Sequence, residues 1–245
     1  MEGSKQPGSE TLFGMHITDV SDQPLLLKQR SLRRLVGILG MVLPILLYLT
    51  LRIGYGHQEE LPSISHYYFT RASIFFIIIV SSLAIFLIIY KDNDPLDFYL
   101  STGAGLFALC VLLFPTDNLV KCCANNPYPY IITFLKDDPA RETFHFISAA
   151  IFLGCLDAMS FFLFTKSDKP KDKRRPRKIW RNRIYRTCSL IMTIALLVSF
   201  LGGYCKLIFP KGYYDAHNLT FWMEAIAIEA FGISWLVKGE TILRD

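Results

Sequence analysis

Long runs of apolar residues, repeated six times along the chain, constrain its fold more than any other feature of the sequence. Each run is at least 17 residues long and holds few charged side chains. About 17–25 consecutive apolar residues are needed for a helix to cross the hydrocarbon core of a bilayer. A core helix of a soluble protein would be shorter and would have one polar face. The sequence therefore predicts an all-α polytopic membrane protein, a bundle of six transmembrane helices.

The predicted transmembrane domain extends over residues 34–238. Its helices cover about 35–51, 69–90, 98–114, 144–164, 188–209 and 221–237. The regions outside these helices include a polar N-terminal tail, a basic loop and a short C-terminal tail, at 1–33, 165–187 and 239–245. Residues 1–27 contain no early apolar run, so we expect the first helix to be an uncleaved anchor rather than a secretory signal.

The distribution of lysine and arginine predicts the orientation. With the N-terminus in the cytoplasm, 19 of the 26 Lys and Arg residues lie on the cytoplasmic side. Cytoplasmic loops of membrane proteins carry this excess of positive charge. Six crossings then return the C-terminus to the same side. We therefore expect an integral membrane protein of the plasma or inner membrane with both termini cytoplasmic.

The basic segment 166–186, from Lys166 to Arg186, holds 11 of these positive charges. Each Lys or Arg near an anionic membrane surface contributes about 1 kcal/mol of attraction. We therefore expect the bilayer, and the anionic lipid headgroups next to this segment, to be its partners. Because the charge follows the topology, nucleic acid is not an expected partner.

Small residues on two of the predicted helices indicate close packing. Ser101, Gly103 and Gly105 follow one another on the third helix. The fourth helix carries a similar set of small side chains, Ser148, Ala149, Ala150, Gly154 and Ala158. Small residues allow the backbones of membrane helices to approach closely. Both helices are therefore predicted to contact their neighbours through these faces.

Most histidines are predicted at the outer, non-cytoplasmic ends of the helices. His66 lies beside Ser63 and Ser65 in PSISHYY, and His145 opens the fourth helix. Nearby carboxylates are Asp117, in FPTDN, and Glu224. Since buried polar groups must find partners, we expect an outer-face cluster formed by Ser65, His66, Asp117, His145 and Glu224.

This cluster fits a metal-dependent hydrolytic site. Histidine and carboxylate are common zinc ligands, and three such ligands with a bound water form a hydrolytic site. The candidate metal ligands are His66, Asp117 and His145. No HExxH or GxSxG motif accompanies them. An interpretation without chemistry, in which these side chains simply lie at the level of the lipid headgroups, stays open.

Four ionisable residues, Arg71, Asp157, Glu224 and Glu229, fall within the predicted helices. Charges at membrane depth are rare and mark transport pathways or interhelical pairs. Asp157 and Glu229 are candidates for a proton or cation path. Arg71 and Glu224 have nearly equal predicted depths, so we expect them to form an ion pair. The alternative partner for Arg71 is Asp117.

Three of the six cysteines, Cys122, Cys123 and Cys205, are predicted to lie on the outer face. An oxidising compartment would allow one disulfide among them. We expect Cys205 to pair with Cys122 or Cys123.

Four stretches of the chain resemble known membrane proteins: PSISHYYFTRASIFF, STGAGLFALCVLLFPTDN, FHFISAAIFLG and FWMEAIAIEAFGISWLVKGE. They are similar to an uncharacterised bacterial family of six-helix membrane proteins, a domain of unknown function, and together cover most of residues 62–240. The FPTD ending of the third helix, followed by a helix opening with histidine, resembles the damage-regulated autophagy modulator superfamily at a distance. This resemblance implies a six-helix fold and no established activity.

A further resemblance is to the membrane hydrolases that include alkaline ceramidases, which place Ser, Asp and His together in a bundle. Those proteins have seven helices and an HxxxH pair, which this chain lacks, so no catalytic residue is carried over. Three functions stay open: a non-enzymatic structural, lipid-sensing or interaction protein, a transporter that uses Asp157 and Glu229, and a metal-dependent lipid hydrolase with zinc as its cofactor.

Overall fold

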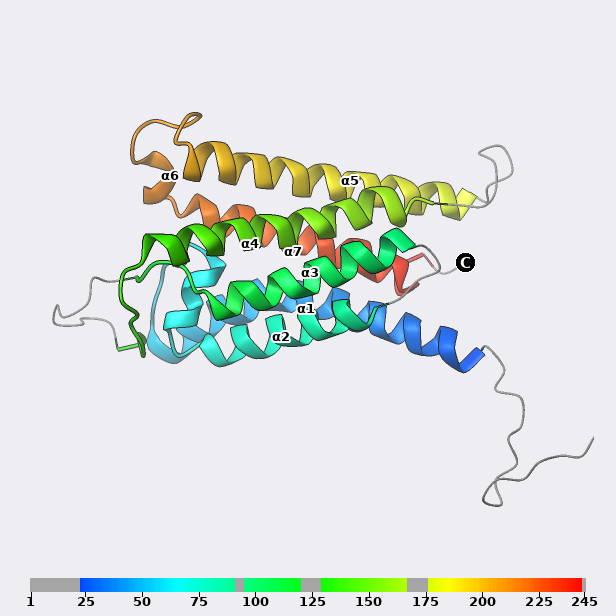
Figure 1. Ribbon diagram of the computed structural model, residues 1–245, viewed down its shortest axis with the longest axis horizontal. Helices are drawn as coiled ribbons and strands as arrows, with labels where there is room; N and C mark the ends of the chain where they lie inside the picture. The colour runs from blue at the N-terminus through cyan, green and yellow to red at the C-terminus, as the bar shows by residue number, and fades with distance from the viewer. Residues whose placement is uncertain (1–22, 91–94, 120–128, 167–175, 244–245) are drawn as a thin grey trace, which may run out of the picture.

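A computed structural model describes residues 23–90, 95–119, 129–166 and 176–243, and most of these residues are helical. The six long helices run back and forth along one axis (Figure 1). They are α1 Gln23–Tyr55, α2 Ser73–Ile89, α3 Pro95–Leu113, α4 Pro139–Ala158, α5 Pro176–Val198 and α7 Leu219–Lys238. Within the described ranges there is no strand, only an isolated bridge between Thr70 and Ile131.

Shorter helical elements complete the fold. A 3₁₀ helix, η1 (Ile64–Phe69), precedes α2, and a single turn, α6 (Tyr213–Ala216), precedes α7. Two π-helical segments, η2 (Met159–Leu163) and η4 (Ser199–Tyr204), extend α4 and α5. We call the end of the bundle that carries η1 and α6 the η1 end. The start of α1 and the end of α7 lie at the opposite end, the termini end (Figure 1).

The sequence located all six long helices, but several boundaries were wrong. The second helix begins at Ser73, because residues 64–69 form a separate 3₁₀ helix. The fifth begins at Pro176, so the second half of the predicted basic loop is helical. Its π-helical extension ends at Tyr204 rather than at residue 209. The apolar run alone misplaces such ends, because helices extend past the hydrophobic stretch and turns interrupt it.

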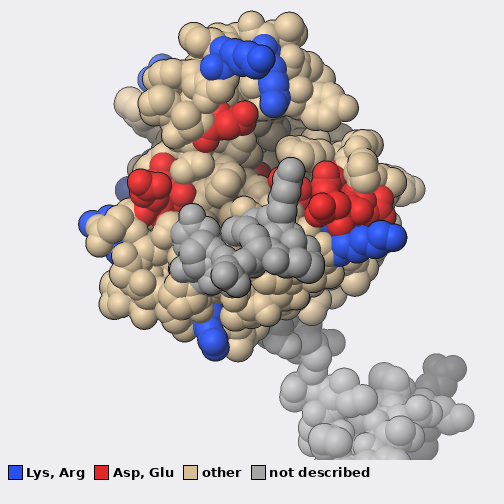
Figure 2. Space-filling model, turned by 90° about the vertical axis from the view of Figure 1, so that its left-hand side faces the viewer, with Lys and Arg blue, Asp and Glu red and all other residues tan. Residues whose placement is uncertain are grey.

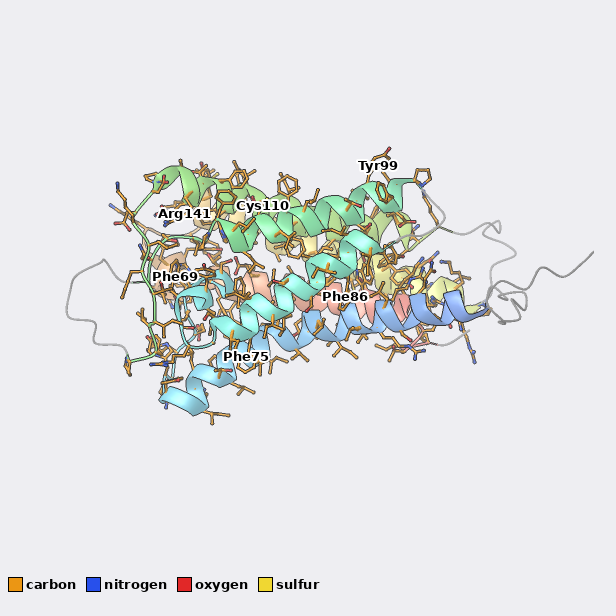
Figure 3. All side chains as sticks on the ribbon, turned by 60° about the horizontal axis from the view of Figure 1, so that its bottom comes forward. Phe69, Phe75, Phe86, Tyr99, Cys110 and Arg141 are labelled. Atoms are coloured by element: carbon orange, nitrogen blue, oxygen red, sulfur yellow. The ribbon has the colours of Figure 1, made fainter. Side chains whose placement is uncertain are left out.

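Five of the helices are long and apolar enough to cross a membrane, and α2 is a shorter apolar helix. The outward surface of the bundle is rich in exposed Ile, Leu and Phe side chains. Phe75 is 37% exposed and Tyr99, which points away from the bundle, is 70% exposed (Figure 3). An apolar surface of this extent is typical of contact with lipid rather than water. The architecture fits a multi-pass membrane protein.

The six long helices form a closed ring in the order α1, α2, α3, α4, α5, α7. Glycines bring two of the neighbouring pairs into close contact. A Cβ atom at Gly232 of α7 would lie 2.9 Å from the carbonyl oxygen of Gly37 on α1. A Cβ at Gly105 of α3 would lie 2.6 Å from the carbonyl oxygen of Ala84 on α2. Both contacts leave no room for a side chain.

The small residues of α4 pack only in part as predicted: Ser148 is fully buried, whereas the other four border open space. A Cβ at Gly154 would meet no atom within 4 Å, and Gly154 and Ala158 border a small hollow. Ala149 and Ala150 line a larger cavity. The pair α4 and α5 is the most loosely packed of the ring. On the side of α4 that faces α5, the small side chains therefore leave space between the helices instead of closing it.

Aromatic side chains fill the ring at the termini end. Trp235 is fully buried and its ring lies 5.1 Å from Tyr90, 5.5 Å from Phe164 and 5.7 Å from Phe231, measured between ring centres. Tyr185 packs against Phe164 at 5.5 Å. This cluster joins the residues that follow α2 and η2 to α5 and α7. Aromatic packing thus closes the ring at the termini end.

The predicted disulfide between Cys205 and Cys122 or Cys123 stays a prediction. Cys205 carries a free thiol just after η4. Its two expected partners, Cys122 and Cys123, lie outside the described residues.

Candidate functional site

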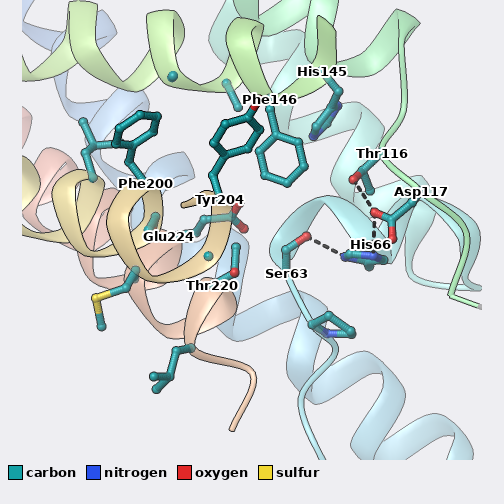
Figure 4. A pocket seen from close by; sticks show the side chains of 18 of the residues that line it. Ser63, His66, Thr116, Asp117, His145, Phe146, Phe200, Tyr204, Thr220 and Glu224 are labelled. Atoms are coloured by element: carbon teal, nitrogen blue, oxygen red, sulfur yellow. Dashed lines mark hydrogen bonds and ion pairs between the residues drawn. The ribbon is translucent and has the colours of Figure 1, made fainter. Parts of the chain in front are cut away.

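A cavity of about 680 Å³ opens at the η1 end, between α4, the α5–η4 helix and α7 (Figure 4). One side is polar and is lined by Ser63, His66, Asp117, His145, Thr220 and Glu224. The other side is apolar and is lined by residues that include Phe146, Ala149, Leu153, Leu196, Phe200 and Met223. The cavity is therefore amphipathic, with a polar end and an apolar wall along the helices.

The segment before η1 is held against the first turns of α7. Both backbone and side-chain groups of α7 take part in these hydrogen bonds. They join Asn218 Nδ2 to the Glu60 carbonyl (2.9 Å), the Phe221 N–H to the Pro62 carbonyl (3.1 Å), and the Ile64 N–H to Glu224 Oε2 (2.7 Å). Since Ser63 lies between two of these anchored residues, its position at the cavity is fixed by α7.

The loop after α3 is fixed by the start of α4. Asn118 exchanges two hydrogen bonds with the backbone of Leu135, at 2.7 and 2.9 Å. Arg141, in the first turn of α4, donates from Nε to the Pro115 carbonyl at 3.0 Å. The Asp138 side chain caps the N-terminus of α4 by accepting from two backbone N–H groups. These contacts place Asp117 opposite η1.

Four side chains from these two anchored segments form a continuous chain of polar contacts (Figure 4). Ser63 Oγ lies 2.7 Å from His66 Nδ1. The other ring nitrogen, His66 Nε2, lies 3.4 Å from Asp117 Oδ1. Thr116 donates its hydroxyl to the same carboxylate oxygen at 2.8 Å. Serine, histidine and aspartate thus occur in the order used by enzymes that activate a serine hydroxyl.

The electrostatics of Asp117 fix the direction of these bonds. The hydrogen bond from His66 holds the pKa of the Asp117 carboxyl at about 2, well below its usual value, although partial burial opposes the shift. An ionised carboxylate only accepts hydrogen bonds. In a neutral imidazole, Nε2 therefore carries the proton. His66 Nδ1 is then free to accept from the hydroxyl of Ser63.

His145 faces the same cavity from α4. It is 3% exposed, and its Nδ1 lies 2.8 Å from the carbonyl oxygen of Phe114. A carbonyl only accepts, so Nδ1 carries the proton in a neutral ring and Nε2 is an acceptor. His145 therefore adds a second imidazole acceptor above Asp117 (Figure 4).

The structure brings together four members of the predicted outer-face cluster, His66, Asp117, His145 and Glu224. Ser65 does not line the cavity, and Ser63 takes its place. The reason is local geometry. With about three residues per turn in a 3₁₀ helix, a residue three positions before His66 lies on its face, whereas its immediate neighbour does not. The sequence named both serines but did not predict the 3₁₀ helix.

The predicted ion pair between Arg71 and Glu224 is wrong. Glu224 accepts a hydrogen bond from the backbone N–H of Ile64. Arg71 lies in the exposed turn before α2, and its N–H donates to the Tyr130 carbonyl at 2.8 Å. No ion pair joins Arg71 to Glu224 or to Asp117 among the described residues. A backbone donor thus satisfies the carboxylate for which the sequence had suggested a charged partner.

The predicted zinc site is also not formed. Within the described ranges, no three His, Cys, Asp or Glu side chains are placed to hold one metal ion. His66 and Asp117 are within 3.4 Å, but each is already engaged with Ser63 or Thr116. His66, Asp117 and His145 therefore border the cavity as hydrogen-bonding groups rather than as a ligand set.

The two deeper carboxylates lie elsewhere. Asp157 on α4 accepts hydrogen bonds from the hydroxyls of Ser189 and, at 2.6 Å, Thr193 on α5. It lines a smaller hollow of about 310 Å³. Glu229 is half-buried on α7 and lines neither cavity. Asp157 therefore has the interhelical bonding role of a packing residue, and the geometry does not link it to Glu229.

Fold and site together define a helical bundle of the multi-pass membrane type with an amphipathic cavity at one end. Comparison with known proteins gives no family model, no curated protein and no solved structure that matches this chain. The function must therefore be argued from the cavity itself.

Proposed function

We propose that this protein is a multi-pass membrane protein that binds an amphipathic molecule in the cavity at the η1 end, with the head at the polar side and the hydrocarbon tail along the apolar wall. The observation that carries the proposal is the division of one cavity into a polar end and an apolar wall. This belongs to the lipid-sensing class of function that the sequence left open.

The size and location of the cavity support such a ligand. Its volume, about 680 Å³, is within the roughly 300–1,000 Å³ typical of sites for small molecules. It lies at the loosely packed junction of α4 and α5, where Phe146 and Tyr204 face each other with ring centres 6.4 Å apart. Tyr204 lines the cavity and is 62% exposed. A molecule dissolved in the bilayer therefore has a direct route between these helices.

The charges around the cavity select among head groups. The described residues that line it include Asp117, Asp215 and Glu224, and no lysine or arginine. Figure 2 shows acidic side chains on this end face with Lys and Arg side chains beside them, and Lys206 lies 3.8 Å from Asp215. Negative charge at a site raises the energy of an anionic ligand and lowers that of a cation. The preferred head therefore carries an amine or hydroxyl groups that donate hydrogen bonds, rather than a phosphate.

Ligand binding tests this proposal directly. A long-chain alkylamine is expected to bind the purified protein at least about tenfold more tightly than an alkyl phosphate of the same chain length, a difference of about 1.4 kcal/mol. Native mass spectrometry in detergent gives both affinities. Substitution of Ala149, on the apolar wall, with phenylalanine is expected to weaken alkylamine binding by a similar factor because the new ring occupies the cavity.

Ala140→Phe is the matched control, since Ala140 is exposed in the first turn of the same helix and does not line the cavity. This variant should bind the alkylamine as the unaltered protein does. Equal affinity for the alkyl phosphate, or unchanged binding by Ala149→Phe, would show that the cavity is not the ligand site.

The topology that accompanies this proposal has six spans, with α2 as the sixth and both termini in the cytoplasm. At about 1.5 Å per residue, α2 is roughly 25 Å long, close to the hydrocarbon thickness. The charge distribution supports this orientation, and the basic segment 166–186 would then face the anionic lipids of the inner leaflet of a plasma or inner membrane. The kinship with six-helix bacterial proteins of unknown function is part of the same proposal.

Thiol labelling in intact cells measures this orientation. Lys173→Cys, in a background without the native cysteines, should react with a membrane-impermeant maleimide only after the cells are opened, because the segment is cytoplasmic. Arg141→Cys, at the opposite end of the bundle, should react before opening. Reversal of the two results would refute the orientation.

A further inference from the structure

We infer that Ser63, His66 and Asp117 form a nucleophilic centre that hydrolyses an acyl ester of the amphipathic molecule bound in the cavity. This inference rests on the proposed ligand site and names its chemistry. The three residues are brought together from two segments that lie about 50 residues apart in the chain. Neither segment belongs to a long helix, and both are anchored by the contacts described above.

The geometry of the polar contacts meets the requirement for activating a serine. A general base must lie within about 2.6–3.2 Å of the oxygen whose proton it takes, and Ser63 Oγ is 2.7 Å from His66 Nδ1. A third group must orient the base, and Asp117 Oδ1 lies 3.4 Å from His66 Nε2. The roles of the two ring nitrogens are the reverse of those in chymotrypsin-like enzymes. An imidazole can take the serine proton on either Nδ1 or Nε2.

A donor for the developing negative charge is also present. The backbone N–H of the residue after a nucleophilic serine commonly stabilises the oxyanion. Here that residue is Ile64, and its N–H already donates to the carboxylate oxygen Oε2 of Glu224 at 2.7 Å. This donor therefore holds a carboxyl oxygen beside Ser63 in the unliganded protein. The acyl oxygen takes that place when the side chain of Glu224 turns away.

The reaction needs only the ester and water. Ser63 Oγ attacks the acyl carbon and its proton passes to His66 Nδ1. The bond from the acyl carbon to the alcohol oxygen breaks, and that oxygen takes the proton from His66, which leaves an acyl-serine. Water then attacks the acyl carbon, with its proton taken by His66, and the bond to Ser63 Oγ breaks as the hydroxyl is restored. The products are a fatty acid and an alcohol.

The position of the centre selects the substrate. Ser63 and His66 lie at the junction of the polar end and the apolar wall (Figure 4). An acyl chain along the wall between Ala149 and Leu196 would present its ester carbonyl at this junction. The acidic lining disfavours a phosphate head, as argued above. The substrate class is therefore a fatty acyl ester of a neutral or cationic, hydroxyl-bearing head.

Covalent labelling with an alkyl fluorophosphonate tests the inference. The oxygen of Ser63 forms a bond to phosphorus, fluoride leaves, and the serine proton goes to His66. In the purified full-length protein, peptide mass mapping should place the adduct on Ser63. Ser63→Ala and His66→Gln should each lower the labelling rate by about 100-fold or more. The hydrolysis of 4-nitrophenyl decanoate should fall in parallel.

Ser65→Ala is the matched control, because Ser65 is a buried serine two residues after Ser63 that does not line the cavity. It should be labelled and should hydrolyse the ester at the normal rate. Alkylamine binding, measured on the same samples, separates the two claims. A protein that binds the alkylamine but carries no adduct on Ser63 overturns the inference and leaves the ligand site standing. A protein that neither binds the alkylamine nor carries an adduct on Ser63 overturns the ligand site and the inference together. An adduct that persists in Ser63→Ala also refutes the inference.

Discussion

Substituting Gly105 with alanine is expected to destabilise the protein by about 1–3 kcal/mol, the usual cost of overpacking a tight contact. The new Cβ would lie 2.6 Å from the carbonyl oxygen of Ala84 and 3.1 Å from the backbone nitrogen of Ile88. Both atoms belong to the backbone of α2 and cannot rotate away. The two helices must therefore separate. Denaturant titration in detergent micelles, followed by tryptophan fluorescence, measures the loss.

Two other glycines serve as controls for this prediction. A Cβ at Gly103 meets only the Cys155 sulfur at 3.8 Å, an ordinary contact, and a Cβ at Gly154 meets nothing within 4 Å. Gly103→Ala and Gly154→Ala should leave the stability unchanged or raise it slightly, since alanine is the better helix former. If Gly105→Ala were no more destabilising than these, α2 and α3 would not pack as closely as the structure has them.

Trp235→Ala is expected to cost about 3 kcal/mol, from the cavity that is left when an indole is removed. Trp235 is fully buried and packs edge-on against Tyr90 and Phe164. Inside a membrane, helix association depends on this packing, because lipid tails are as apolar as the core. The stability can be followed by circular dichroism during thermal unfolding in detergent.

The matched variant is Trp235→Phe. The indole Nε1 of Trp235 has no hydrogen-bond partner among the described residues, so phenylalanine loses no hydrogen bond and keeps most ring contacts. It should recover at least half of the stability lost in Trp235→Ala. Equal losses in both variants would mean that the aromatic cluster does not stabilise the termini end through packing.

Much of the helical architecture could be predicted from apolar run length, because a membrane allows few alternatives to helices. The six long helices were found in this way. Their ends were not, since turns such as the one at Thr70 and Arg71 are formed by backbone bonds to residues 130–132, far along the chain. The length of a hydrophobic run does not predict such contacts.

The site was predicted by residue type and only in part by geometry. His66, Asp117 and His145 were selected because polar groups at helix ends must find partners, and they border one cavity. The choice of Ser65 over Ser63 failed because it depended on a 3₁₀ helix. The pairing of Arg71 with Glu224 failed because a backbone N–H can satisfy a carboxylate as well as a side chain can. Charge and depth alone do not distinguish these partners.

Whether the small residues of α4 pack closely also depends on the neighbouring helix, α5. The same residue types bring α2 and α3 together at Gly105, yet they border open space at Ala149 and Gly154. Small side chains permit close approach but do not enforce it. Whether the space is closed depends on the partner helix, and α5 stays apart from α4 at the cavity. The amphipathic cavity is the consequence of that gap.

Photo-crosslinking tests the central claim, that an amphipathic molecule occupies this cavity, most directly. A long-chain alkylamine with a diazirine in its tail is bound to the purified protein, irradiated, and the modified peptides are sequenced. The account predicts adducts on residues of the apolar wall, such as Leu153, Leu196 and Met223, that disappear with excess unlabelled alkylamine. Adducts confined to outward-facing side chains such as Tyr99 and Phe75, and not displaced by the competitor, would contradict it.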